Sequence, residues 1–268
     1  MQALTKDLVA VPEHWRLSLR LTADALDVFA HPFIGEEEPL AAVIPFEPGV
    51  ARQADALQEA IYANPLLLQP FGRVDFVVAS EDVLIVPNEA DSQLIAGLFG
   101  LDEDCQVLES AVDNRSKAMF MLPKAVANFI TRTFERTAPR HELSVLAEYF
   151  GTKGRQNNAS RMFVDLGERS ANILAYGPYG LIAAKHIDKA TNDDVAYWTL
   201  AIFKEAGLDA ETNEIMISGD SQRRHALMPQ LNRFVSYVMP AIFPAAAYHG
   251  SAAAMRAPFS LSVISLCE

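Results

Sequence analysis

The sequence has few cysteines and no excess of basic residues, and each shortage excludes a class of protein. Cys105 and Cys267 are the two cysteines of a 268-residue chain, and no Cys-x-x-Cys pattern is present. Two thiols cannot form a disulfide framework, so we expect reduced cysteines in a cytoplasmic protein. The 22 Lys and Arg residues against 34 Asp and Glu residues give a net charge of −12, which leaves no positive excess to neutralise phosphates. We therefore expect no nucleic-acid partner.

Long apolar runs are also lacking. No stretch approaches the ~18 consecutive apolar residues of a membrane span. Charged residues among the first 14 positions leave no continuous apolar core for a signal peptide. We expect a cytoplasmic chain without a membrane span. The segment 237–248 is apolar but interrupted by Pro240 and Pro244, and we interpret it as part of the core or of an interface.

Signatures of common catalytic sites are missing as well. The six histidines show no metal-ligand spacing, and neither His-x-His nor His-x-x-x-His occurs. The chain has no Gly-x-Ser-x-Gly, no phosphate-binding Gly-x-x-x-x-Gly-Lys and no Gly-x-Gly-x-x-Gly. We therefore assign no catalytic residue and no metal site from the sequence.

The composition does supply enough apolar material for a large core. Half of the residues are hydrophobic and 21% are charged, which argues against intrinsic disorder. A chain of this length buries roughly 70–75% of the surface that its unfolded form exposes. It fits one large domain or two smaller ones.

Strand and helix patterns recur in the same order in two halves of the chain. The first half predicts strands at residues 15–21, 25–29 and 40–46, a helix at 51–63 and a strand at 74–79. The second half predicts strands at 162–166, 171–176 and 181–187, a helix at 192–206 and a strand at 215–217. The fold class is therefore α/β, with two related halves.

The region between the halves is mixed. We expect a helix at 88–99, paired strands at 105–112 and 117–122, and a helix that begins at Pro123 and runs to about residue 134. The polar stretch 151–160 is typical of a linker, so we place the domain boundary there and predict domains at 1–150 and 151–268. The alternating residues 259–266 predict a last strand.

Three stretches of the second half carry a resemblance to known proteins. Residues 163–170 (Phe-Val-Asp-Leu-Gly-Glu-Arg-Ser) resemble the second phosphate hairpin of the actin, Hsp70 and sugar-kinase superfamily, and residues 215–220 resemble its adenosine motif. Residues 193–198 with 206–209 are similar to an uncharacterised family of Bacteroidota, the domain of unknown function number 3822. The resemblance implies duplicated ribonuclease H-like halves that flank a central cleft.

The resemblance also implies which residues would bind a nucleotide. In that superfamily, glycines of two hairpins let backbone N–H groups approach the phosphates, and an acidic side chain holds magnesium or its waters. The positions that match these motifs are Asp165, Gly167, Ser170, Gly219 and Asp220. The residues alone leave other roles open: Asp165 can cap its own hairpin, and Asp220 can be the N-cap of the following helix.

The sequence departs from the superfamily pattern at all three motifs. The first hairpin, residues 22–25, has no glycine, and its Asp24 lies in the turn instead of on the preceding strand. Glu168 and Arg169 replace a glycine in the second hairpin, and Asp220 replaces the second glycine of the adenosine motif. These changes argue against phosphoryl transfer.

We therefore predict a pseudoenzyme: a catalytically degenerate binding or scaffold module with a protein partner and no cofactor. It would use the cleft or the helix faces around Tyr197 and Trp198, of which one is expected to fill the core and the other to face the partner. The alternative is a weak ATP-binding ATPase or kinase that uses Mg-ATP in the cleft. A third hypothesis, an enzyme with unrelated chemistry in the cleft, has no catalytic constellation to support it.

Overall fold

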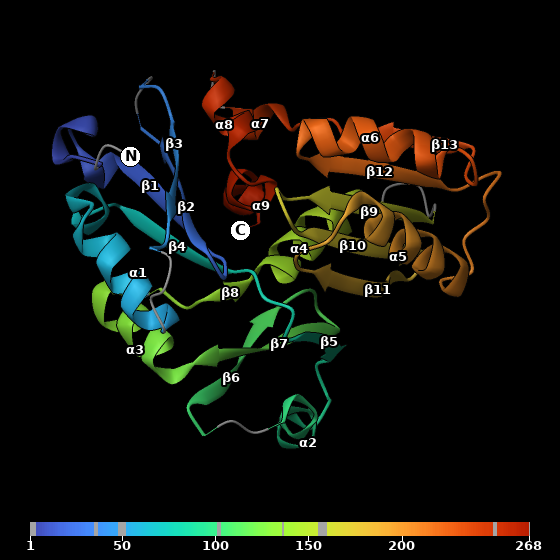
Figure 1. The fold of residues 1–268 in the computed structure, drawn as a ribbon, viewed down its shortest axis with the longest axis horizontal. Coiled ribbons are helices and arrows are strands. Elements are labelled where there is room, and N and C mark those ends of the chain that lie inside the picture. The colour runs from blue at the N-terminus through green and yellow to red at the C-terminus, as the bar shows by residue number, and fades with distance from the viewer. Residues whose placement is uncertain are drawn as a thin grey trace.

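Two five-stranded sheets and a smaller three-stranded sheet form the framework of the computed structural model (Figure 1). It describes residues 4–34, 37–47, 52–100, 103–135, 137–154, 160–248 and 251–267. The two large sheets have the same strand order and directions, so the predicted α/β fold with two related halves is confirmed.

The first large sheet has the order β3-β2-β1-β4-β8. Its strands are β1 (Trp15–Leu21), β2 (Ala25–Pro32), β3 (Leu40–Pro45), β4 (Arg73–Val78) and β8 (Arg140–His141). Strands β1, β2 and β3 are antiparallel neighbours, whereas β4 runs parallel to β1. Helices α1 (Gln53–Tyr62) and α3 (Lys124–Thr133) supply apolar side chains to one face of this sheet.

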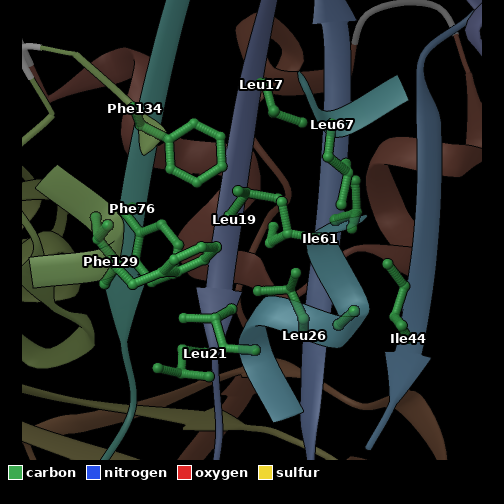
Figure 2. Close-up of a cluster of buried hydrophobic side chains, with 14 of the residues drawn as sticks. Leu17, Leu19, Leu21, Leu26, Ile44, Ile61, Leu67, Phe76, Phe129 and Phe134 are labelled. Atoms are coloured by element: carbon green, nitrogen blue, oxygen red, sulfur yellow. The ribbon is translucent and has the colours of Figure 1, made fainter. Parts of the chain in front are cut away.

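The core of this half follows from the alternation in β1. Leu17, Leu19 and Leu21 point to one face of the sheet, where they pack with Ile61 of α1 and Phe76 of β4 (Figure 2). The arginines and the serine of β1 alternate with these leucines and so point to the opposite face. That opposite face lies toward the second half of the chain.

The second large sheet has the order β11-β10-β9-β12-β13. Its strands are β9 (Arg161–Leu166), β10 (Ala171–Gly177), β11 (Gly180–Ile187), β12 (Glu214–Gly219) and β13 (Tyr237–Pro240). Helices α5 (Asn192–Glu205) and α6 (Ser221–Leu231) cover one face. Thr191 is the N-cap of α5. Its side chain accepts a hydrogen bond from Asp194 N–H, and the Asp194 carboxylate accepts one from Thr191 N–H.

A small sheet of order β5-β7-β6 is inserted between β4 and α3. Its strands are β5 (Val83–Pro87), β6 (Cys105–Ala111) and β7 (Ser116–Pro123). The helix predicted at 88–99 is shorter: α2 spans Ser92–Ala96, because Asp91 caps it, and a 3-10 turn at Gly97–Phe99 follows. Further 3-10 turns lie at Lys6–Leu8, Pro12–His14, Pro65–Leu68 and Ile264–Leu266.

Helix α4 (Glu142–Gly154) and the C-terminal helices α7 (Ala245–Tyr248), α8 (Ala252–Arg256) and α9 (Phe259–Val263) complete the fold. Helices α4 and α9 lie centrally, between the two large sheets (Figure 1). Phe150 of α4 stacks on Phe163 of β9 with ring centroids 4.2 Å apart. Helix α4 thereby ties the two halves together through an apolar contact.

Two predictions from the sequence concern this central region. The strand predicted at 259–266 is wrong: Ser260 and Ser262 are buried and bond to Glu142 and to the Ala254 carbonyl, so a polar residue at every second position does not mark a solvent face. The predicted linker begins inside α4, and residues 155–159 lie outside the described part. The division into 1–150 and 151–268 stays a prediction.

None of the helices in the described part of the chain has the length and apolarity that a bilayer crossing requires.

Candidate functional site

Two equivalent hairpins, β1–β2 and β9–β10, meet between the halves, and we call the region between these hairpins the cleft. Arg20 is the last residue but one of β1 and pairs with Asp27 across the hairpin. Asp165 holds the same place in β9, where it pairs with Asn172. The register therefore makes Arg20 the counterpart of Asp165.

This equivalence was missed from the sequence. The sequence shows that Asp24 lies in the turn and that the strand before it lacks the expected carboxylate. It does not show that Arg20 occupies the position equivalent to Asp165. Counting two residues back from each turn would have found that a basic residue stands in one half where an acidic one stands in the other.

The Arg20 guanidinium is buried at the centre of a polar network. Its Nη1 donates to Asp27 Oδ2 at 2.7 Å, and its Nε and Nη2 donate to the two carboxylate oxygens of Glu142 at 2.7 and 3.0 Å. Its Nη2 also lies 3.4 Å from Ser170 Oγ, at the end of the second hairpin. Ser260 of α9 donates to Glu142 Oε1 at 2.7 Å. Strands β1 and β2, helices α4 and α9 and the second hairpin each contribute a polar group to this network.

Burial and charge set the protonation states of this network. Burial disfavours the charged form of Arg20, but the nearby carboxylates of Glu142 and Asp27 outweigh this effect and raise the pKa of Arg20. Arg20 and Ser260 in turn outweigh the burial of Glu142 and lower its pKa to about 2. At Asp27 burial outweighs the charge of Arg20 and raises the pKa. The network is therefore an ion pair of Arg20 and Glu142, with Asp27 bonded to the same guanidinium.

Two buried histidines extend the network without adding charge. His186 Nδ1 lies 2.8 Å from Asn172 Oδ1, and the His141 and His186 rings meet edge to face at 5.8 Å. Burial, followed by the charge of the neighbouring His186, lowers the pKa of His141 to about 3. Burial also lowers the pKa of His186. Both imidazoles are neutral at physiological pH.

Asp165 is buried in the second half of the cleft. Its Oδ1 accepts from Ser218 Oγ of β12 at 2.7 Å, and its carboxyl also bonds to the side chain of Asn172, its partner across the hairpin. Burial, reinforced by the negative charge of Glu142, raises its pKa to about 7. The carboxyl is therefore partly protonated at neutral pH.

Gly167 and Ser170 close the second hairpin on itself. Gly167 N–H donates to the Ser170 carbonyl at 3.0 Å. Arg223 of α6 donates through Nη1 to the carbonyls of both residues at 2.8 Å and through Nη2 to the Ala190 carbonyl at 2.8 Å. Arg223 thus presents its donors to the hairpin backbone and not to solvent.

Gly219 and Asp220 form the turn from β12 into α6. Gly219 has φ +81°, and a Cβ there would overlap the Leu166 carbonyl, so the turn requires glycine. Asp220 is the N-cap of α6: its side chain accepts from Arg223 N–H at 2.7 Å. The structure thus gathers all five residues of the expected nucleotide site around the β9–β10 hairpin and the β12–α6 turn.

The tips of the two hairpins also meet. Arg169 Nη1 of the second hairpin lies 3.3 Å from Asp24 Oδ2 of the first, and both side chains are exposed. The Thr22 hydroxyl accepts from Ala25 N–H at 3.0 Å and shapes the first turn, which has no glycine. The polar mouth of the cleft is thus bridged by the protein itself.

A cavity lies elsewhere in the described part of the protein. A cavity of about 640 Å³ opens between the Asp113–Arg115 turn, α4 and the β10–β11 turn. None of the five expected nucleotide-site residues lines it.

One position does not fit a magnesium-bound nucleotide. The buried guanidinium of Arg20 stands at the strand position where the resemblance implies a carboxylate. Among the residues that the structure describes, no group of three or more His, Cys, Asp or Glu side chains is placed to hold a metal ion.

The aromatic pair on α5 differs from expectation. We expected one of Tyr197 and Trp198 to fill the core, but the side chains are 65% and 38% exposed. The reason is that Val195, Thr199 and Phe203 form the buried face of α5, and residues 197 and 198 lie off that face. Lys185 of β11 places its ammonium 4.3 Å from the centre of the Trp198 ring.

Comparison with solved structures identifies the class of fold. A Bacteroides thetaiotaomicron protein with an actin-like ATPase fold and unknown function matches with a TM-score of 0.75 and 18% identity, over 86% of this chain and 91% of that one. The PilM-PilN type IV pilus biogenesis complex matches with a TM-score of 0.55 and 11% identity, over 97% and 99%. The chain has the actin-like ATPase fold.

The family follows from the sequence itself. The model of the family "Protein of unknown function (DUF3822)" matches residues 14–238, and the chain belongs to this family. A comparison with curated proteins finds no match.

Proposed function

We propose that this protein is a catalytically degenerate member of the actin-like ATPase fold that works as a binding or scaffold module. One observation carries the proposal: Arg20 stands at the strand position where the resemblance implies a carboxylate, and it is already bonded to Asp27, Glu142 and Ser170. In the other half, Asp165 is bonded to Ser218.

Nucleotide binding would have to break these bonds. Each broken bond leaves a buried donor or acceptor unsatisfied unless the ligand replaces it, at a cost of roughly 1–3 kcal/mol. Displacing Arg20 would also leave two buried carboxylates without their cation, which typically costs about 3–5 kcal/mol. Binding would have to offset all of these terms.

A protein partner is the better supported ligand. Exposed aromatic side chains are the residues that dominate protein interfaces, and Tyr197 and Trp198 offer two of them side by side. The structural neighbour PilM is found in a complex with PilN, which is consistent with a binding role for this fold. A chain with two cysteines and no Cys-x-x-Cys pattern supports our proposal of a cytoplasmic location.

A weak ATPase or kinase is the alternative. It is favoured by the convergence of Asp165, Gly167, Ser170, Gly219 and Asp220 on one hairpin and one turn. This hypothesis requires the Arg20 cluster to open when Mg-ATP binds.

Thermal unfolding with and without millimolar Mg-ATP and Mg-ADP separates the two. Ligand at 100 times its Kd would add ~2.7 kcal/mol, a melting shift of roughly 5–10 °C at this chain length. We expect a shift below about one degree. A shift near the full value that Asp165→Asn abolishes would refute the proposal and favour the ATPase; Asp193→Asn, at an exposed site on α5, is the matched control.

A further inference from the structure

Strand β1 carries two buried arginines on the same face, and their partners differ. Arg16 and Arg20 are each 6% exposed. Arg16 forms its ion pair with Asp75 on the adjacent strand β4, inside the first sheet. Arg20 reaches Glu142 on α4 and Ser170 in the second half. Arg20 therefore bonds across the cleft, whereas the ion pair of Arg16 lies within the first sheet.

The Arg20 bridge extends to the C-terminus through Glu142. The carboxylate that receives two bonds from Arg20 receives a third from Ser260, in α9. A single guanidinium thus joins the first sheet, the central helix α4, the second hairpin and, through Glu142, the C-terminal helix.

The arrangement requires a cation at this point. Asp27 and Glu142 converge on the guanidinium from two elements, and both are buried. Two carboxylates cannot both stay ionised in such a place without a positive charge between them. The neighbouring histidines, His141 and His186, offer none, because both are neutral.

We propose that Arg20 is a built-in cation that locks the two halves in one relative position, so that the cleft stays closed without a ligand. The inference rests on the proposed function, because a nucleotide site would need this position open. It goes further in assigning the lock to one side chain, which acts by position and charge and not through catalysis.

Hydrogen exchange of Arg20→Met against Arg16→Met tests the lock. Both changes remove one buried guanidinium from the same strand and keep a side chain of similar length. For Arg20→Met we expect amide exchange to rise at least about tenfold more in α9 and in the hairpin at residues 167–170 than for Arg16→Met, since about 1.4 kcal/mol of lost local stability gives that factor. Equal increases in the two variants would overturn the proposal.

A second variant tests the charge. Arg20→Asp places a third carboxylate beside Asp27 and Glu142 in the space that the guanidinium leaves, which is the donor set that Mg²⁺ prefers. We expect Mg²⁺ at ten times its Kd to raise the melting temperature of Arg20→Asp by roughly 3–6 °C. Arg20→Asn, of the same size but uncharged, should show no shift. Equal responses of the two variants would show that no cation position exists there.

The outcomes separate the two proposals. A nucleotide-dependent shift in the unmodified protein would refute the proposed function. A normal exchange pattern in Arg20→Met, with no nucleotide binding, would refute only the lock.

Discussion

Asp165→Asn should stabilise the protein at alkaline pH and leave it unchanged at acidic pH. Burial raises the pKa of Asp165 from 3.8 to about 7, so the folded state holds this proton more tightly than the unfolded state does. The free energy of unfolding therefore falls as the pH rises between these two values, and the full cost is present above pH 7. Asparagine has no proton to lose and keeps an oxygen that can accept from Ser218.

The size of the effect follows from the two pKa values. Each pH unit between them is worth ~1.4 kcal/mol, so the difference from 3.8 to about 7 gives at most about 4 kcal/mol above pH 8. For a chain of this length that is a melting difference of roughly 8–16 °C. Below pH 4 the two proteins should melt together.

Denaturant unfolding of both proteins at pH 5, 6, 7 and 8.5 checks this expectation. The two histidines with lowered pKa values destabilise the fold at acidic pH, but they act equally in both proteins and cancel in the difference. Asp193→Asn, at an exposed site on α5, is the matched control. A gain for Asp165→Asn that is the same at every pH would refute the reasoning, because it would come from packing and not from a buried charge.

Three further substitutions probe the second hairpin and its neighbours. Gly219→Ala should cost more than about 3 kcal/mol, because its Cβ meets the Leu166 carbonyl, whereas Gly207→Ala, also at positive φ but with open space around it, should cost only ~1 kcal/mol in urea unfolding. Arg223→Met should cost about 1–3 kcal/mol, because the carbonyls of Gly167 and Ala190 lose their donor while the Ser170 carbonyl keeps the Gly167 N–H; an unchanged melting temperature would contradict this. Tyr176→Phe should cost ~1 kcal/mol, because the hydroxyl that donates to the Ala147 carbonyl is lost, and equal urea midpoints would argue against that bond.

The sequence predicted those parts of the fold whose periodicity is local. The alternation of β1 and of the two hairpins, and the capped helix at 192–206, are evident from neighbouring residues alone. Helix α4 could not be found in this way, because its residues are buried almost all round and show no polar face. The sequence of α9 alternates like a strand, because its serines face the interior and not solvent.

The candidate site also has one part that local sequence predicts and one part that it does not. Asp165, Gly167, Ser170, Gly219 and Asp220 could be named from short motifs, and the structure brings them together. The partners that fill the cleft could not be named, because Glu142 lies 122 residues from Arg20 in the chain and Ser260 lies 118 residues from Glu142. A buried glutamate carries no local signal of its burial; only the fold brings its cation to it.

Hydrogen exchange of the unmodified protein with and without Mg-ATP tests the central claim most directly, because it reports on the hairpins themselves. Amides of the two hairpins, at residues 21–26 and 166–171, lie where a bound triphosphate would protect them. A cleft filled by the protein's own side chains predicts the same exchange rates with and without saturating nucleotide. Protection of both hairpins by Mg-ATP, lost in Asp165→Asn but kept in Asp193→Asn, would contradict the account.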